Sequence, residues 1–96
     1  MKIAMISFTG NGRRLERSLA HELEKEGHQV LQAVKCKELE SDKDAVKCSA
    51  REWTGEQIRT RDVLIFIGAV QIAVRLIASF IGSKTTDPAV LVLDEK

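Results

Sequence analysis

Aromatic side chains are scarce in this sequence of 96 residues, which contains one Trp, three Phe and no Tyr. Proteins that bind single-stranded nucleic acid stack successive bases on such rings, so the scarcity argues against that function. The formal net charge is only +1, which provides no global electrostatic attraction for nucleic acid or for an anionic membrane. We therefore expect neither of them as a partner.

Cysteine is also rare, and Cys36 and Cys48 are the only two. They lack the C-x-x-C spacing of redox and zinc motifs, and His21 and His28 are poorly spaced to complete a zinc site. We expect reduced thiols, no metal site and no cofactor. The apolar run that ends at Phe8 is too short for a signal peptide, and no uncharged segment reaches transmembrane length. These absences favour a cytoplasmic protein.

The sequence does contain a regular alternation of apolar and helical segments. We expect strands over residues 2–8, 28–34, 63–67 and 89–93, and helices over residues 13–26, 54–60 and 69–81. Strands that alternate with helices predict an α/β fold with a parallel sheet between two helical layers. Right-handed crossovers favour the strand order 2-1-3-4, a flavodoxin-like or Rossmann-like arrangement truncated after strand four. We expect a single domain over residues 1–96, the N-terminal part of a longer enzyme.

Two segments between these elements have irregular patterns. Ser49 and Thr54 each begin a capping-box sequence, and we expect a short helix that starts at Thr54. The segment 35–47 is densely charged and has no periodicity, which predicts a solvated loop rather than a binding element.

The third helix and the last two strands are apolar enough to predict which surfaces are covered. Only the stripe of Gln71, Arg75 and Ser79 is polar in residues 69–81, so we expect this helix to be buried except along that stripe. In the order 2-1-3-4, the first helix covers one face of the sheet and the other two cover the opposite face. The third and fourth strands then have one face without a helix of their own. We expect further chain or a second copy, as in a homodimer, to cover that face.

A candidate site follows from the predicted sheet. In open parallel sheets, ligands bind at the carboxyl ends of the strands where the strand order reverses, here between the first and third strands. The loop after each of these strands precedes a helix, and free N–H groups at a helix start favour anions. Arg13, Arg14, Arg75 and Lys84 would add charge nearby, although each alone is expected to be an ordinary surface residue. The predicted binding residues are Thr9, Gly10, Asn11, Gly12, Gly68, Ala69, Val70, Gln71 and Arg75.

The segment from Ser7 to Gly12 also resembles the phosphate loop of flavodoxins, which holds flavin mononucleotide. Gly12 replaces the final hydroxyl of that loop, and the aromatic residues that would sandwich the flavin ring are nearly absent. A flavin- or nucleotide-binding module is therefore a second hypothesis. A non-catalytic interaction domain, supported by the uncovered apolar face, is a third.

Several stretches together carry a family resemblance. They are Ile3 to Gly12, Glu52 to Thr54, Leu64 to Ala69 running into Ile72 to Arg75, and Lys84 to Val90. In this combination the sequence is similar to the N-terminal domain of the cobalt-precorrin 5A hydrolases of anaerobic cobalamin biosynthesis, the CbiG family. The combination is specific, and the Gly68-Ala69 pair with the segment 84–88 contributes most to it.

The resemblance implies a hydrolase that opens the δ-lactone of a cobalt-bearing contracted tetrapyrrole and releases its two-carbon unit as acetaldehyde. It implies a cobalt-corrinoid intermediate as substrate and C-terminal domains of the same enzyme as partners, without which this chain is expected to be inactive. Backbone N–H groups of residues 69–71 would face an oxyanion or a carboxylate, and Arg75 or Lys84 would pair with carboxylate arms. Asp87 and Asp94 are candidate bases, but we favour structural roles for both, so no catalytic residue is assigned.

Overall fold

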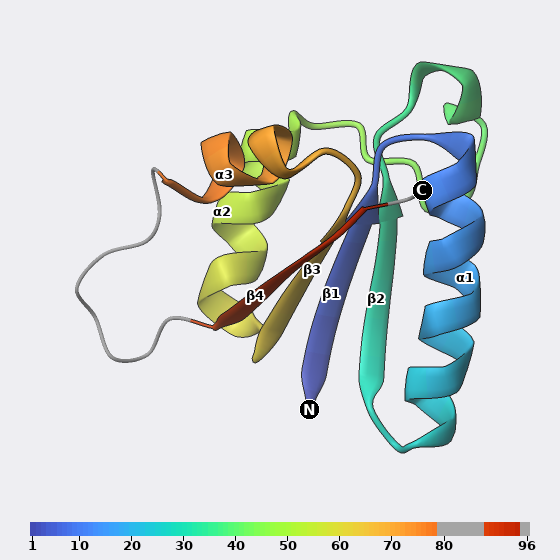
Figure 1. Cartoon of the computed structure of the whole chain (residues 1–96), viewed down its shortest axis with the longest axis vertical. Helices are drawn as coiled ribbons and strands as arrows, with labels where there is room; N and C mark the ends of the chain where they lie inside the picture. The colour runs from blue at the N-terminus through green and yellow to red at the C-terminus, as the bar shows by residue number, and fades with distance from the viewer. Residues whose placement is uncertain (79–87, 95–96) are drawn as a thin grey trace.

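The computed structural model describes residues 1–78 and 88–94, which form a layered α/β structure (Figure 1). Its elements in chain order are β1 (Lys2–Ser7), α1 (Gly10–Lys25), β2 (Gln29–Val34), the short 3-10 helix η1 (Lys37–Leu39), α2 (Ala50–Thr60), β3 (Val63–Ile67), α3 (Val70–Ala78) and β4 (Ala89–Leu93). The strands are all parallel and lie in the order β2-β1-β3-β4. The predicted fold class and strand order are confirmed.

The central strands β1 and β3 are buried on both faces, as their uninterrupted apolar sequences predict. Figure 1 shows α1 on one side of the sheet and α2 with α3 on the other. The core on the α1 side contains Ile3, Met5, Ala20, Ile65 and Ile67. The opposite core contains Ala4, Ile6, Ala33, Trp53, Leu64, Phe66 and Ala73. In that core Trp53 and Phe66 meet edge to face with ring centroids 6.4 Å apart, an arrangement that aromatic pairs favour.

Two helices begin earlier than the sequence patterns predict, because a hydroxyl caps each of them. The Thr9 hydroxyl accepts a hydrogen bond from the Gly12 N–H at 3.0 Å, so α1 starts at Gly10 rather than Arg13. The Ser49 hydroxyl accepts from the Glu52 N–H at 3.1 Å, so α2 starts at Ala50 rather than Thr54. Thr54 instead donates its hydroxyl to the Ala50 carbonyl at 2.8 Å inside the helix. The predicted end of the third helix, including Ser79, lies outside the described residues.

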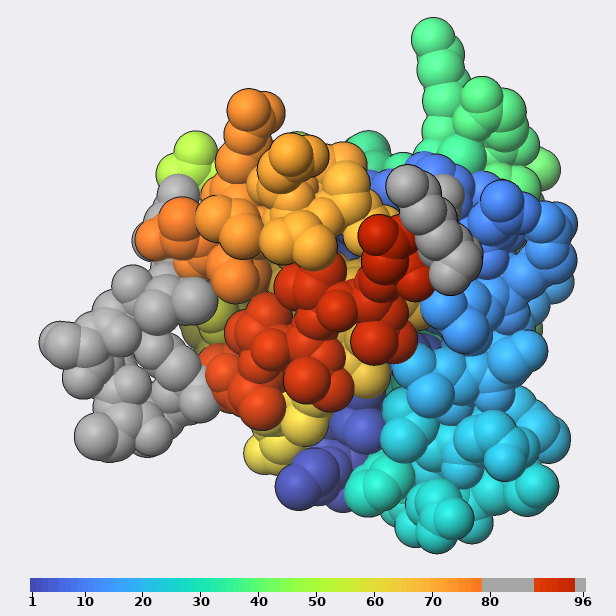
Figure 2. All heavy atoms as spheres, in the orientation of Figure 1, coloured from blue at the N-terminus to red at the C-terminus, as the bar shows by residue number. Residues whose placement is uncertain are grey.

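The expectation that the third helix is largely buried is wrong. Ala73 is the buried residue of α3, whereas Val70, Ile72 and Val74 are 54%, 41% and 52% exposed. Figure 2 shows the side chains of α3 beside those of β4 on one face of the molecule. These apolar residues are exposed because α3 contacts α2 and β4 along one side only. None of the described residues covers its outer side.

The expected uncovered face of the third and fourth strands is present only at β4 among the described residues. Ile65 and Ile67 of β3 are buried in the core on the α1 side, because α1 contacts β3 as well as β1 and β2. Leu91 of β4, which pairs with Ile65, is 51% exposed. The uncovered apolar strand surface is therefore narrower than predicted.

Within residues 1–78 and 88–94, no helix has the length and hydropathy needed to cross a membrane.

Candidate functional site

The two candidate loops leave the same edge of the sheet from neighbouring strands. β1 and β3 pair with Ser7 opposite Ile67, so Phe8 and Gly68 follow side by side. A Cβ added to Gly68 would lie 3.3 Å from Phe8 Cδ2, and Gly68 has a φ of +155° that favours glycine. The convergence of these loops, which are distant in sequence, is confirmed.

The N-terminal end of α1 offers fewer free donors than the sequence predicts. The Gly12 N–H is bound to Thr9 Oγ1, and the Arg13 N–H donates to the Thr9 carbonyl at 2.9 Å. Gly10 and Asn11 are exposed, whereas Gly12 is buried. On this side, the accessible part of the predicted site is therefore the first turn at Gly10 and Asn11.

The start of α3 forms the other side of the candidate site. Ala69, Val70 and Gln71 are all exposed, and the Ala69 carbonyl accepts hydrogen bonds from the N–H groups of Ile72 and Ala73 at 3.1 and 3.4 Å. The backbone here is already helical, so its first N–H groups point away from the helix body toward solvent. This end is open to a ligand.

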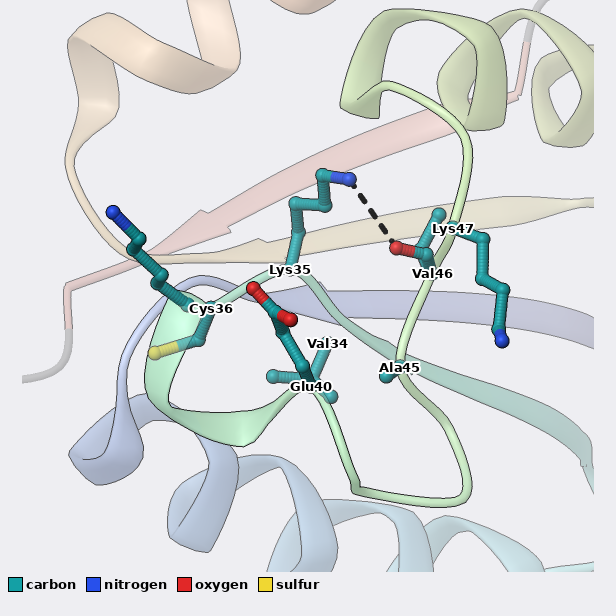
Figure 3. A pocket seen from close by; sticks show the side chains of 8 residues that line it. Val34, Lys35, Cys36, Glu40, Ala45, Val46 and Lys47 are labelled. Atoms are coloured by element: carbon teal, nitrogen blue, oxygen red, sulfur yellow. Dashed lines mark hydrogen bonds between the residues drawn. The ribbon is translucent and has the colours of Figure 1, made fainter.

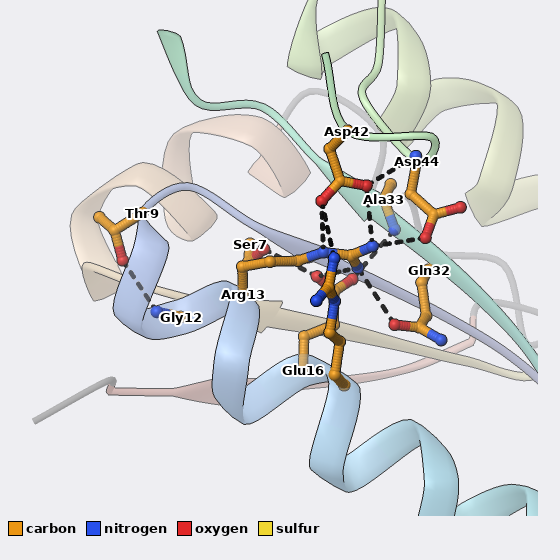
Figure 4. Close-up of polar contacts among 10 residues, drawn as sticks. Ser7, Thr9, Gly12, Arg13, Glu16, Gln32, Ala33, Asp42 and Asp44 are labelled. Atoms are coloured by element: carbon orange, nitrogen blue, oxygen red, sulfur yellow. Dashed lines mark hydrogen bonds and ion pairs between the residues drawn. The ribbon is translucent and has the colours of Figure 1, made fainter. Parts of the chain in front are cut away.

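Arg13 is not the surface cation that the sequence predicts, because its side chain is only 4% exposed. Its guanidinium lies 3.1 Å from Glu16 and 3.0 Å from Asp42, and it also pairs with Asp44 (Figure 4). Glu16 is fully buried and also accepts hydrogen bonds from the Ser7 hydroxyl at 2.7 Å and from the Ala33 N–H at 3.0 Å. We call Arg13, Glu16, Asp42 and Asp44 the Arg13 network.

The Arg13 network sets one guanidinium against three carboxylates, so each group alters the ionisation of the others. Burial disfavours the charged form of Arg13, but the carboxylates of Asp44, Asp42 and Glu16 outweigh burial and raise the pKa of this guanidinium. Burial raises the pKa of Glu16, against the opposing effect of its hydrogen bonds from Ser7, Ala33 and Arg13. The Asp44 N–H, and secondarily Arg13, lower the pKa of Asp42. Arg13 therefore serves folding and is not available to a ligand.

The segment 35–47 is not the fully solvated loop that its composition predicts. The side chain of Asp42 is only 6% exposed where it binds Arg13. The Val46 N–H donates to the Val34 carbonyl at 2.9 Å, and the Val34 N–H donates to the Asp44 carbonyl at 3.0 Å. Two of its carboxylates thus neutralise a buried cation, and its backbone extends the pairing of β2.

The remaining predicted cations have different positions. Arg14 is exposed and donates to the Asn11 side chain at the start of α1. Arg75 is exposed on α3. Lys84 and the candidate base Asp87 lie outside the described residues, and the other candidate base, Asp94, is exposed after β4. Ala89 pairs with Val63 at the amino ends of the strands, so the chain enters β4 at the edge opposite the candidate site, as predicted.

A cavity of about 580 Å³ follows β2, and sequence reasoning did not find it (Figure 3). Its lining residues are Val34, Lys35, Cys36, Lys37, Glu40, Ala45, Val46 and Lys47. The Cys36 thiol lies 3.1 Å from the Glu38 carboxylate, which raises the pKa of Cys36 and lowers that of Glu38. In the sequence, only the position of this lysine-rich segment could have indicated the cavity. The segment follows a strand and therefore starts at the same sheet edge as the two candidate loops.

The Arg13 network also had a signal in the sequence. Arg13, Glu16, Ala20 and Leu23 are spaced three, four and three residues apart, which places them on one helix face. Apolar residues alone do not define this face, because Leu15 is 38% exposed whereas Arg13 and Glu16 are buried. Within the described residues, no group of three or more His, Cys, Asp or Glu side chains is arranged to hold a metal ion.

Comparison with known proteins tests the family resemblance. Residues 52–96 match the sequence model of the family described as Cobalamin synthesis G N-terminal. The resemblance to the CbiG N-terminal domain is confirmed. A segment of 37 residues is 54% identical to the cobalt-precorrin-5A hydrolase of Salmonella typhimurium and covers 38% of this chain but only 10% of that protein. No solved structure matches the chain. The CbiG match includes the Gly68 loop and α3, whereas the Thr9 loop, the Arg13 network and the cavity precede it.

Proposed function

We propose that this chain is the N-terminal domain of a cobalt-precorrin 5A hydrolase of cobalamin biosynthesis. The observation that carries the proposal is the CbiG match over residues 52–96, which includes β3, the Gly68 loop and α3. The proposed reaction opens the δ-lactone of a cobalt-bearing contracted tetrapyrrole by addition of water and releases the two-carbon unit as acetaldehyde. The remaining domains of a longer enzyme would be its partners in this reaction.

The candidate site suits two of the tasks that this reaction requires. Addition of water to a lactone carbonyl places negative charge on its oxygen, and backbone N–H groups at a helix start stabilise such charge. The exposed turn from Ala69 to Gln71 supplies these groups at the edge where β1 and β3 meet. The exposed Arg75 supplies a cation for a carboxylate arm of the ring. The general base is assigned to no residue of this chain.

The geometry gives no support to a flavin- or nucleotide-binding module. Only Phe8 and Thr9 separate β1 from α1, so Gly10 to Gly12 of the compared segment are already helical. The Thr9 hydroxyl, which would contact the phosphate, instead caps α1 through the Gly12 N–H.

A chimera tests the proposed function. Residues 52–96 of this chain would replace the aligned residues of the Salmonella typhimurium hydrolase, and acetaldehyde release from cobalt-precorrin 5A would be measured. We expect an active chimera, because the two proteins share 54% identity over 37 residues. Arg75→Ala in the chimera should raise KM about threefold to tenfold with little change in Tm, as expected for the loss of an exposed charge pair.

The matched control is Arg59→Ala, which removes another exposed arginine from the same segment and should leave KM unchanged. A folded chimera that releases no acetaldehyde contradicts the proposed function. An active chimera in which Arg75→Ala lowers Tm but leaves KM unaltered contradicts only the role of Arg75.

A further inference from the structure

The cavity after β2 combines an apolar floor with an excess of positive charge. Its apolar lining comes from Val34, Ala45 and Val46, and its charged lining contains three lysines and one acid, Glu40. Its volume of about 580 Å³ lies within the range of pockets that hold small organic molecules. Figure 3 shows the Lys35 amine directed to the Val46 carbonyl, which lies 3.3 Å away.

Of the acidic residues of the same loop, only Glu40 lines the cavity. Glu38 lies next to the cavity, with its carboxylate 3.1 Å from the thiol of the lining residue Cys36, and offsets part of the positive charge. Asp42 and Asp44 are paired with Arg13 on the side of the loop that faces α1, and neither residue lines the cavity. Lys37 and Lys47 are exposed, so their amines are accessible to a ligand. The charge separation therefore favours an anion in the cavity.

The walls of the cavity are held in place from two sides. The Val46 N–H binds the Val34 carbonyl at 2.9 Å on the β2 side. On the α1 side, Arg13 binds the loop through Asp42 at 3.0 Å. A cavity that is already formed avoids the entropic penalty of ordering a loop when the ligand binds.

The cavity lies at the same sheet edge as the candidate site at the starts of α1 and α3. The Lys35 N–H donates to the Ser7 carbonyl at 2.9 Å, so the cavity begins beside the end of β1, from which Phe8 and Thr9 lead to the candidate site. A ligand with several carboxylates on one apolar frame could occupy both regions.

We propose that this cavity binds carboxylate arms of a polycarboxylated ring compound, with Lys37 and Lys47 as the binding cations. Lysine amines pair with the carboxylates, and the apolar floor contacts the hydrocarbon of the arms. The identification of the ring as a tetrapyrrole rests on the proposed function, whereas the preference for carboxylates rests on the cavity alone.

Binding to the 96-residue chain tests the proposal with two probes. Uroporphyrin I, a tetrapyrrole with eight carboxylates, is titrated by its fluorescence, and tricarballylate, a tricarboxylate without a ring, is titrated by NMR shifts. The double variant Lys37→Gln with Lys47→Gln should bind both probes about tenfold more weakly. Each exposed charge pair that is lost accounts for about threefold of this decrease. Added salt should weaken binding further. Lys35 is left intact because its amine binds the Val46 carbonyl.

The control variant is Lys2→Gln with Lys43→Gln, which removes the same charge from two exposed lysines outside the cavity and should leave both affinities within twofold of wild type. Equal losses in the two double variants, or no loss in either, overturn the proposal even if the chimera is active. If tricarballylate binding depends on Lys37 and Lys47 but uroporphyrin does not bind, the carboxylate site stands. The assignment of the ring as a tetrapyrrole then fails at this cavity, whereas the proposed function is tested separately by the chimera.

Discussion

The helices α1 and α3 follow the two central strands, yet their burial is the reverse of what their compositions suggest. α1 is rich in charge, and its buried residues include Arg13 and Glu16. α3 is predominantly apolar, and Val70 and Val74 are more than half exposed. Both helices start at the same edge of the sheet, each after a central strand. The contrast in their burial therefore arises from the residues that pack against each of them.

The contrast shows that the burial of a helix face depends on the partners available to it. Arg13 is buried because three carboxylates converge on its guanidinium from α1 and from the loop after β2. Buried charges are tolerated when they are paired and hydrogen-bonded. For α3, the described residues provide a partner on one side only, and its apolar outer side therefore meets solvent.

The largest effect is expected from removing the cation of the Arg13 network. Arg13→Met should lower the free energy of unfolding by about 3–5 kcal/mol, because it leaves the buried Glu16 without its cation and leaves Asp42 with Arg17 alone. Arg14→Met, its neighbour on the exposed side of α1, should change it by less than about 0.5 kcal/mol. Urea denaturation measures both. Similar values for the two variants would show that the network contributes nothing specific.

The two glycines at the candidate site should respond differently to an added methyl group. Gly68→Ala should destabilise the fold by about 1–2 kcal/mol, because Gly68 has a φ of +155° and Phe8 Cδ2 would lie 3.3 Å from the new Cβ. Gly10→Ala has open space and a helical position, so it should stabilise the fold by about 0.5 kcal/mol. Thermal denaturation distinguishes the two variants. If Gly68→Ala is more stable than wild type, the positive φ of Gly68 is contradicted.

Acid should remove the contribution of Asp42 to stability. Its pKa is lowered in the folded state by the Asp44 N–H and by Arg13, so its ionised form stabilises the fold above the ordinary aspartate pKa of about 3.9. This contribution is lost as the pH falls through the lower folded-state pKa. The stability difference between wild type and Asp42→Asn should therefore be largest near neutral pH and shrink below about pH 4. A difference that does not change with pH would assign the effect to packing.

Urea titrations of both proteins across this pH range measure the difference directly. Glu16, whose pKa is raised, acts in the opposite sense, because burial of its charge opposes folding as the pH rises. It is present in both proteins, so the comparison reports Asp42 together with its coupling to Glu16 through Arg13.

The smallest effect on stability is expected on the exposed surface of α3. We predict that the chain associates at micromolar concentration through α3 and β4, where Val70, Ile72, Val74 and Leu91 are exposed. Val74→Glu should reduce association while changing the free energy of unfolding by about 0.5 kcal/mol or less. Leu15→Glu, the matched change on the exposed side of α1, should leave association intact. Sedimentation measures both, and a monomeric wild type would contradict the prediction.

The sheet was predictable from sequence because its signals are local. The apolar run 63–67 and the alternation of strands with helices were enough to predict four parallel strands and their order. The convergence of the Thr9 and Gly68 loops then followed from topology alone. Helix starts were less predictable, because Ser49 and Thr54 offer the same cap and only packing decides between them.

The buried charges and the cavity could not be found in the same way. Arg13 meets Asp42 and Asp44 across 29 and 31 residues of sequence, and no local pattern reports such a pairing. The charged composition of residues 35–47 predicts solvent exposure, yet two of its acids neutralise a buried guanidinium. The cavity depends on that pairing, because the loop that forms its wall is held to α1 by Arg13.

The Arg13 network also has a consequence for motion. Asp42 and Asp44 join the loop after β2 to the first turns of α1, and Ser7 contacts both Glu16 and the Lys35 N–H. Local opening of this loop therefore requires several charge pairs to break together, so the loop and the start of α1 form one cooperative unit in hydrogen exchange. Among the described residues, no comparable charge pairs hold the start of α3, so we expect it to open independently. We therefore expect slower hydrogen exchange at the start of α1 than at the start of α3, which leaves the α3 side of the candidate site free to adjust to a ligand.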